Sequence, residues 1–134
     1  ADAHGGGLAN AKKKLKVEKV FADYRAMLRE VKPDIVAVCP RHADQHHDMA
    51  LAAIEAGARG IYIEKPFVRT PAEVDSLAAA CKKHGKWAGM GGIVNNDHAQ
   101  TYIDMGVRFV LAGAETGFIA AGAKARTEGL RKLR

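Results

Sequence analysis

Short apolar runs alternate with longer amphipathic stretches along the chain, and this alternation is the feature that most constrains its fold. Apolar runs of about four to eight residues are typical of buried strands, and apolar residues spaced three or four apart are typical of helices. The regular order of strand and helix predicts an α/β fold, a three-layer sandwich with a mainly parallel sheet of about five strands. The expected strands are 17–21, 35–39, 60–64, 86–92 and 108–113, and the expected helices are 8–14, 23–31, 46–56, 71–84, 97–105 and 116–133.

Two helix boundaries are marked by particular residues. Thr70-Pro71-Ala72-Glu73 combines an N-cap, a proline in the first helical position and an acidic third residue. Gly57, directly after Ala56, is typical of a helix end. No linker or low-complexity segment interrupts the 134 residues, so we expect a single domain over residues 1–134.

Composition and charge narrow the class of function. The net charge is +6, and the basic residues gather near the two ends of the chain without the motifs of a nucleic-acid-binding protein. A positive field favours a small anionic substrate. Cys39 and Cys81 have no metal-ligand spacing, and no signal peptide or membrane-spanning stretch is evident, so we expect a cytoplasmic protein with no membrane partner.

A dense group of ionisable residues follows the expected strand 35–39. It comprises His42, Asp44, His46, His47 and Asp48. Imidazole and carboxylate groups together suit Zn, Mn, Fe or Ni, which predicts a site for one divalent metal ion or two. The alternative is a polar loop at a helix N-terminus, in which Asp44 or Asp48 caps the helix and the histidines are solvated.

Other ionisable residues follow the neighbouring expected strands. In a parallel sheet all strands end at one edge, where ligands bind. This edge would bring Glu64 and Lys65, and also Asp97 and His98, toward the histidine-rich loop. The arrangement favours the metal-site hypothesis over the polar-loop alternative.

The first 85 residues or so carry a familiar set of motifs. Pro33-Asp34-Ile35-Val36-Ala37-Val38, His46, the run 49–57 and Glu64-Lys65-Pro66 followed by Thr70-Pro71-Ala72-Glu73 resemble the glucose–fructose oxidoreductase/inositol dehydrogenase (Gfo/Idh/MocA) family. The resemblance implies an N-terminal Rossmann fold that holds NAD(P), with Lys65 near the nicotinamide.

The sequence departs from that family in its phosphate-binding turn. The family has a Gly-x-Gly-x-x-Gly turn after its first strand, whereas the chain begins at about the end of the second strand, and no strand precedes Gly5-Gly6-Gly7. The family's substrate domain is also absent. We therefore expect a truncated Rossmann-like fold that does not use NAD(P).

The resemblance changes at about Gly85. Gly91-Gly92-Ile93, the run 102–110 and Gly117-Phe118-Ile119 resemble the C-terminal end of class II pyruvate (HpcH/HpaI-type) aldolases, with Glu115 where that family usually has Asp. The metal ligands and catalytic residues of that family lie on earlier strands, so aldolase activity is not expected. The sequence thus resembles a chimera of a dehydrogenase-like part, 1–85, and an aldolase-like part, 86–134.

Three functions remain open. The first is a metal-dependent hydrolase, a phosphodiesterase in which His42, Asp44, His46, His47 and Asp48 hold the metal, with Lys65 and Glu64 as catalytic residues. The second is a catalytically inert chimera of the two parental pieces, and the third is a residual NAD(P)-dependent oxidoreductase. Of these, the histidine-rich loop favours the hydrolase, acting on a phosphate ester. We also expect a homodimer, because truncation leaves apolar surface or a strand edge for a second copy to cover.

Overall fold

The structure, a computed structural model, describes residues 1–92 and 95–133. The chain forms two compact units, Ala1–Lys86 and Trp87–Arg134. We call these the N-terminal unit and the C-terminal unit and describe each by itself. The prediction of a single domain over the whole chain stays a prediction.

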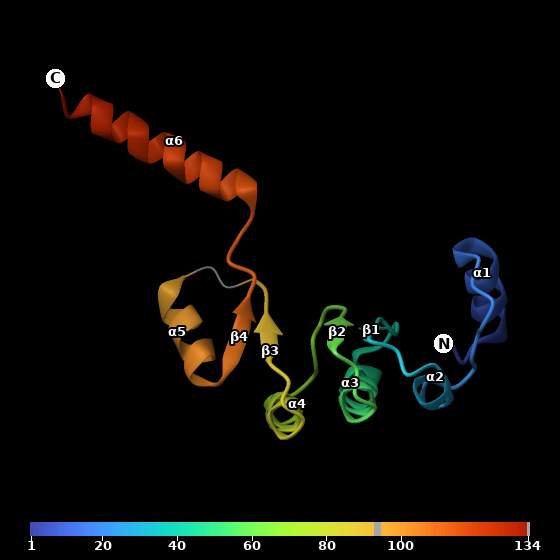
Figure 1. Ribbon diagram of the computed structural model, residues 1–134. Helices are drawn as coiled ribbons and strands as arrows, with labels where there is room; N and C mark the ends of the chain where they lie inside the picture. The colour runs from blue at the N-terminus through green and yellow to red at the C-terminus, as the bar shows by residue number, and fades with distance from the viewer. Residues whose placement is uncertain (93–94, 134) are drawn as a thin grey trace. The chain divides into compact units, whose positions relative to one another are not determined.

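The N-terminal unit alternates helices with two strands (Figure 1). Its elements are α1 (Gly5–Leu15), α2 (Tyr24–Val31), β1 (Ile35–Val38), the short 3-10 helix η1 (Ala43–Gln45), α3 (His46–Glu55), β2 (Gly60–Ile63) and α4 (Pro71–Lys83).

The two strands of this unit form a parallel pair. Ile35 is paired with Gly60 and Val38 with Ile63, and the amide of Glu64 donates a hydrogen bond of 3.0 Å to the carbonyl of Val38. Both strands therefore end at the same edge. The loops that leave this edge, 39–42 and 64–70, carry three of the candidate functional residues, His42, Glu64 and Lys65, and the other four lie in η1 and at the start of α3. The βαβ connection through α3 is the usual way to join parallel strands.

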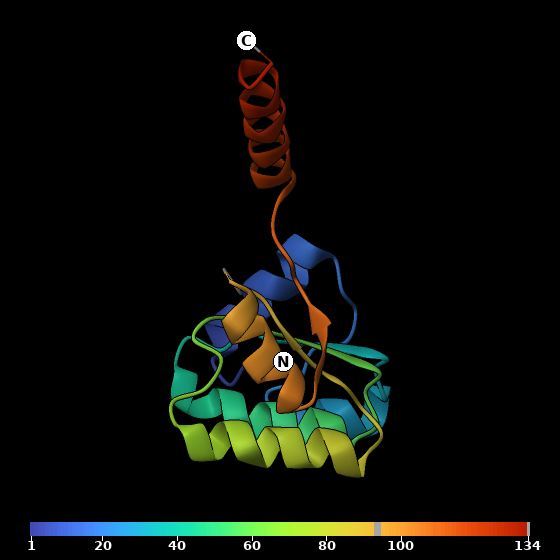
Figure 2. The same ribbon diagram turned by 90° about the vertical axis from the view of Figure 1, so that its left-hand side faces the viewer.

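The apolar core lies on one face of this strand pair. Val36 and Val38 of β1 are buried with Leu28 of α2 and Ala53 of α3. A neighbouring side of α3 packs through Ala50 and Ile54 on Leu77 of α4, and Figure 2 shows α3 and α4 side by side. On the other face of the strands Ile35 is 73% exposed and Tyr62 is 64% exposed. The described helices of this unit thus cover one face of the strand pair.

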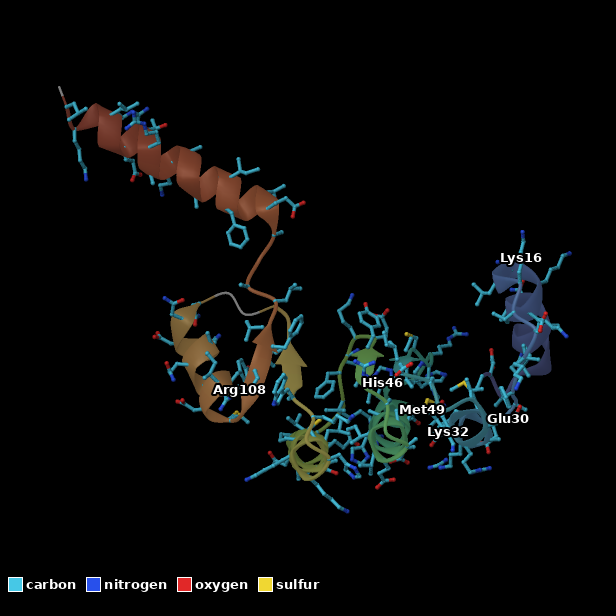
Figure 3. The ribbon with its side chains drawn as sticks, viewed as in Figure 1. Lys16, Glu30, Lys32, His46, Met49 and Arg108 are labelled. Atoms are coloured by element: carbon cyan, nitrogen blue, oxygen red, sulfur yellow. The ribbon has the colours of Figure 1, made fainter. Side chains whose placement is uncertain are left out.

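Side-chain and backbone caps fix the helix ends. Asp23 accepts hydrogen bonds from the amides of Arg25 (2.9 Å) and Ala26 (3.2 Å) at the start of α2. The C-caps of α1 and α2 are Lys16 and Lys32, with φ of 52° and 46°, and both are labelled in Figure 3. Lysine lacks the conformational freedom of glycine at such a position, but the amide of Lys32 donates to the carbonyl of Leu28 and so satisfies the last turn.

The strand expected at residues 17–21 is absent from the N-terminal unit as described. An extended segment becomes a strand only where a neighbour supplies a ladder of backbone hydrogen bonds. The amide of Asp2 donates to the carbonyl of Phe21 at 3.0 Å, and this single bond does not make a ladder.

The C-terminal unit contains a second parallel pair. Its elements are β3 (Ala88–Met90), α5 (Asn96–Asp104), β4 (Val107–Val110) and α6 (Glu115–Arg131), and β3 pairs with β4. The register shifts between Ala88 and Gly89, where the side chain of Phe109 lies so close that a Cβ on Gly89 would meet it at 3.1 Å. Arg108, labelled in Figure 3, donates at 2.9 Å to the carbonyl of Ile103 near the end of α5.

The structure confirms the predicted α/β class with parallel strands, and all six expected helices are present within a few residues of their predicted bounds. The strands differ from the expectation in number and grouping. Over the described residues there are four, in two separate pairs, where one sheet of about five was expected. The three-layer arrangement is likewise not formed within the N-terminal unit, because Ile35 and Tyr62 leave one strand face uncovered.

Candidate functional site

The candidate site lies at the edge where β1 and β2 end. The loop after β2 holds Glu64, Lys65 and Phe67, and α4 begins after its last residue, Thr70. The loop after β1 holds Cys39 and His42 and leads through η1 into α3. A ligand at this edge would meet both loops, as in other open parallel sheets.

Lys65 is a highly accessible charged residue of this edge. Its side chain is 92% exposed, and its ammonium lies 4.0 Å from Oε1 of Glu64. The same Glu64 oxygen accepts a hydrogen bond of 2.8 Å from the backbone amide of Lys65. An ion pair this long and this exposed contributes little energy, so the ammonium is free to approach an anionic or polar ligand. The peptide bond between Lys65 and Pro66 is cis.

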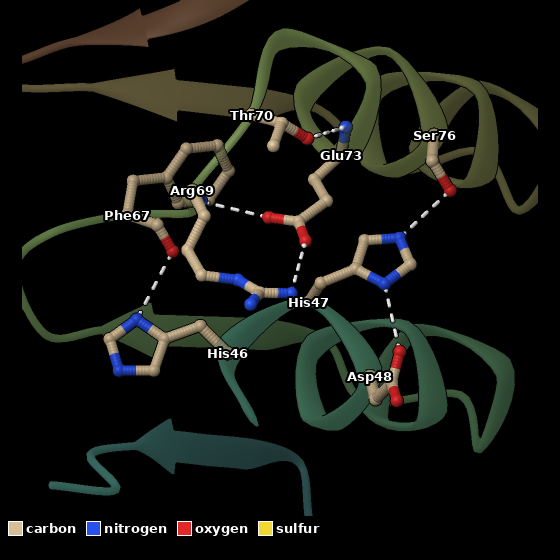
Figure 4. Close-up of polar contacts among 8 residues, drawn as sticks. All are labelled: His46, His47, Asp48, Phe67, Arg69, Thr70, Glu73 and Ser76. Atoms are coloured by element: carbon tan, nitrogen blue, oxygen red, sulfur yellow. Dashed lines mark hydrogen bonds and ion pairs between the residues drawn. The ribbon is translucent and has the colours of Figure 1, made fainter. Parts of the chain in front are cut away.

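His46 opens α3 and is the largest fully buried side chain, with 1% of its surface exposed. Its Nδ1 lies 3.1 Å from the carbonyl oxygen of Phe67 (Figure 4). A carbonyl only accepts, so Nδ1 carries the proton and donates. The imidazole therefore joins the start of α3 to the loop that carries Lys65.

His47, the next residue, turns toward a different neighbour. Its Nε2 lies 3.0 Å from Oγ of Ser76 on α4, and its Nδ1 lies 2.9 Å from Oδ1 of Asp48 (Figure 4). The His47–Asp48 contact is partly exposed, with 67% of the Asp48 side chain open to solvent. His47 thus connects α3 with α4 rather than with the loop after β2.

The far end of that loop is held by a capping box. Oγ1 of Thr70 accepts from the amide of Glu73 at 3.3 Å, and Glu73 accepts from the backbone amide of Arg69 at 2.8 Å and from its guanidinium at 3.1 Å (Figure 4). The hydrogen bond from the Arg69 amide, aided by the Arg69 guanidinium, holds the pKa of the Glu73 carboxyl below its ordinary value of 4.5. The loop is therefore fixed at Phe67 by α3 and at Arg69 by α4.

Asp44 and Asp48 line a shallow hollow of about 200 Å³ together with Tyr24, Gln45 and Met49. His42 lies at the N-cap of η1 and is exposed, and its side chain makes no capping hydrogen bond. Two of the five predicted metal ligands therefore share one hollow, while His46 and His47 turn elsewhere.

Over residues 1–92 and 95–133 the structure contains no group of three or more His, Cys, Asp or Glu side chains placed to hold a metal ion. The reason is helical geometry. Consecutive helical residues point about 100° apart, so His46 turns toward Phe67 while His47 and Asp48, which contact each other, turn away from it. Residues that are dense in the sequence are thus spread in space.

Two partners in this region were missed by the sequence analysis. Ser76 is a single hydroxyl on an expected helix, and the carbonyl of Phe67 is a backbone acceptor that no residue type reveals. The Thr70–Glu73 capping box, by contrast, was predicted from the sequence.

The fold and the strand-end loops define a Rossmann-type dinucleotide-binding class. The family described as an oxidoreductase family with an NAD-binding Rossmann fold matches residues 1–106. The chain belongs to this family. The resemblance inferred from the Glu64-Lys65-Pro66 region is thereby confirmed, and the match continues past Gly85, where the sequence analysis placed a change.

Individual relatives agree with the family. The D-glucoside 3-dehydrogenase of Escherichia coli is 39% identical over 67 residues, which are 50% of the chain and 18% of that protein. The uncharacterized oxidoreductase YhhX of the same organism is 38% identical over 64 residues, 48% of the chain and 18% of that protein. The chain thus spans about a fifth of the length of these relatives.

Solved structures show the same fold. The crystal structure of an NAD-binding oxidoreductase from Klebsiella pneumoniae superposes with a TM-score of 0.56 at 28% identity, covering 64% of the chain and 22% of that protein. A putative oxidoreductase from Bacteroides fragilis matches with a TM-score of 0.51 at 24% identity, covering 58% of the chain and 24% of that protein. At this identity the second likeness shows the fold alone.

These findings overturn the favoured function. The prediction of a metal-dependent hydrolase or phosphodiesterase is wrong, because the family and the relatives are oxidoreductases. The prediction of a divalent metal in place of NAD(P) is wrong for the same reason, since the family is NAD-binding. The loop composition that suggested a metal is explained in part by the structural contacts of His46 and His47.

Other expectations stay predictions. They include the aldolase likeness of residues 86–134, the homodimer, the lack of a nucleic-acid partner and the cytoplasmic location. Among the described helices, none combines the length and apolar character needed to span a membrane.

Proposed function

We propose that the chain supplies part of the dinucleotide site of an NAD(P)-dependent oxidoreductase, with Lys65 as its functional residue. The proposal rests on the position of Lys65. It lies two residues beyond Ile63, the last residue of β2, at the edge where open parallel sheets bind ligands, and its side chain is 92% exposed. Family membership supplies the reaction class, which is hydride transfer with a nicotinamide cofactor.

The described residues fit one end of such a cofactor. The residues that would hold it are Lys65 and the backbone of the two loops that leave the strand ends, 39–42 and 64–67. The sequence contains no Gly-x-Gly-x-x-Gly run, so these residues account for the nicotinamide side of the site and not for its pyrophosphate. When bound, the dinucleotide accepts or donates the hydride.

Lys65 acts through its charge and its donors. An ammonium offers three N–H donors, and here it has one long ion-pair contact, to Glu64. Glu64 in turn accepts from the backbone amide of Lys65, which keeps the carboxylate beside the lysine. We expect Lys65 to hold polar atoms at the reaction centre and Glu64 to orient it.

The name of one relative indicates a substrate class for that relative. That relative is a D-glucoside 3-dehydrogenase, and we extend to the chain the dehydrogenase reaction alone. The alignment covers 18% of that protein, so its sugar specificity is not extended to the chain.

Titration of the ¹⁵N-labelled chain with NAD⁺ and NADP⁺ up to millimolar concentration tests the proposal. We expect chemical-shift changes at amides of residues 39–42 and 64–67, where the strands end. Lys65→Ala should weaken binding by about three- to tenfold, the factor expected for one polar contact. Lys83→Ala is the matched control, since Lys83 is an exposed lysine in the last turn of α4, outside the strand-end loops.

Two results would contradict the proposal. One is the lack of shift changes at the strand-end loops with either dinucleotide, which would favour the inert-fragment hypothesis. The other is an equal loss of affinity in Lys65→Ala and Lys83→Ala, which would indicate a nonspecific effect of positive charge.

A further inference from the structure

We propose that His46 is a positioning residue that sets the conformation of the loop carrying Lys65. The inference rests on the proposed function, because it assigns to His46 the geometry of the same site. It starts from a buried polar side chain. His46 is 1% exposed, and a side chain with two ring nitrogens is costly to bury unless its polar atoms are satisfied.

The bond that His46 makes leads directly to the functional loop. Nδ1 donates to the carbonyl of Phe67, two residues after Lys65. Between them stands Pro66, whose ring fixes its own φ, so few backbone torsions separate the anchored carbonyl from Lys65. Fixing the Phe67 peptide therefore restricts the directions available to the lysine.

The middle of the loop has one apolar neighbour in the core, because Val68 packs against the cluster of Ala50, Ile54 and Leu77. The ring of Phe67 is 46% exposed, so its side chain gives the loop little burial. The next described anchor, the Arg69–Glu73 contact, holds the end of the loop nearest α4. His46 supplies the described hydrogen bond between the middle of the loop and α3.

Two variants with a matched control separate this role from simple packing. His46→Leu keeps an apolar side chain of fair size and removes the donor. His46→Asn removes volume but keeps an N–H donor attached to Cγ, as Nδ1 is. His47→Leu is the control, because it removes an imidazole from the same turn of α3 whose bonds lead to Ser76 and Asp48 and not to the loop.

The first measurement is backbone order without any dinucleotide, from ¹⁵N relaxation at Lys65, Phe67 and Val68. In the parent chain and in His47→Leu we expect order parameters of about 0.85. In His46→Leu we expect them to fall below about 0.6, and in His46→Asn we expect them to return toward the value of the parent chain. If His46→Asn is as disordered as His46→Leu, or if His47→Leu has the same effect as His46→Leu, packing explains the result and the proposal is overturned.

The second measurement is dinucleotide affinity in the same variants. His46→Leu should weaken NAD⁺ binding by about three- to tenfold, and His46→Asn should recover most of that loss. If the parent chain binds no dinucleotide, the proposed function fails while the relaxation data still decide the role of His46.

A third measurement needs no substitution and so does not depend on how the variants fold. Two-bond ¹H–¹⁵N correlations report which imidazole nitrogen carries the proton. We expect the Nδ1–H tautomer for His46 in the parent chain. An unprotonated Nδ1 cannot donate to the Phe67 carbonyl and would overturn the proposal.

Discussion

Nε2 of His47 lies 3.0 Å from Oγ of Ser76, and this contact joins α3 to α4 across a gap of 29 residues in the sequence. The two side chains are partly buried, beside the apolar contact of Ala50 and Ile54 with Leu77. A polar bond and an apolar cluster thus hold the same helix pair, and α4 in turn anchors the loop after β2 through Arg69 and Glu73.

This contact should appear as a coupling energy. We expect His47→Ala and Ser76→Ala each to lower the free energy of unfolding, with a coupling of about 0.5–1.5 kcal/mol in a double-mutant cycle measured by urea titration. Asp48→Asn serves as the control, because its exposed contact with His47 should change stability by less than about 1 kcal/mol. Strict additivity of the two alanine variants would show that the hydrogen bond contributes nothing.

Ile54 is part of the small apolar core of the N-terminal unit. It is 3% exposed on α3, so Ile54→Ala should cost about 2–5 kcal/mol, from lost burial and the cavity left behind. Ile35→Ala removes the same atoms at a position that is 73% exposed and should cost well under about 1 kcal/mol. Thermal unfolding followed by circular dichroism measures both, and equal losses would place the core elsewhere.

Glu73 makes stability depend on pH. Its pKa is lowered in the folded chain, so its contribution is full above the ordinary value of 4.5 and is lost as the pH falls through the lower folded value. Glu73→Gln should therefore melt at a lower temperature than the parent chain at pH 7, and the difference should shrink as the pH falls below about 4.5. A difference in melting temperature that stays constant from pH 7 to pH 3 is incompatible with this assignment.

The two cysteines should differ in reactivity. Cys39 is exposed at the end of β1, whereas burial raises the pKa of the Cys81 thiol on α4. The thiolate is the reactive form, so at pH 8 a disulfide reagent such as DTNB should label Cys39 in a fast phase and Cys81 in a slow one. Cys39→Ser should remove the fast phase alone, and the reverse assignment of the phases would contradict the structure.

The order of the helices and strands could be predicted well from the sequence. Apolar periodicity places β1 and β2 within one residue of their observed ends, and Thr70-Pro71-Ala72-Glu73 marks the start of α4, because each depends on neighbours in the chain. The segment 17–21 has the composition of a strand, but a strand also needs a partner, which local sequence does not reveal.

The site was harder to predict for two physical reasons. The density of His and Asp along the chain suggested that these side chains converge on one metal ion, whereas the first turn of α3 directs His46 away from the paired His47 and Asp48. The partner of His46 is a backbone carbonyl 21 residues away, which residue identity does not encode. The Glu64-Lys65-Pro66 motif was the feature that pointed to the family correctly.

The central claim is that Lys65 serves the nicotinamide end of a bound dinucleotide. The most direct test compares the affinity of the parent chain and Lys65→Ala for NAD⁺ and for ADP-ribose, which lacks the nicotinamide, by isothermal titration calorimetry or NMR. We expect Lys65→Ala to weaken NAD⁺ binding by about three- to tenfold and to leave ADP-ribose binding nearly unchanged, while Lys83→Ala changes neither. An equal loss for both ligands in Lys65→Ala, or no loss for either, would contradict the claim.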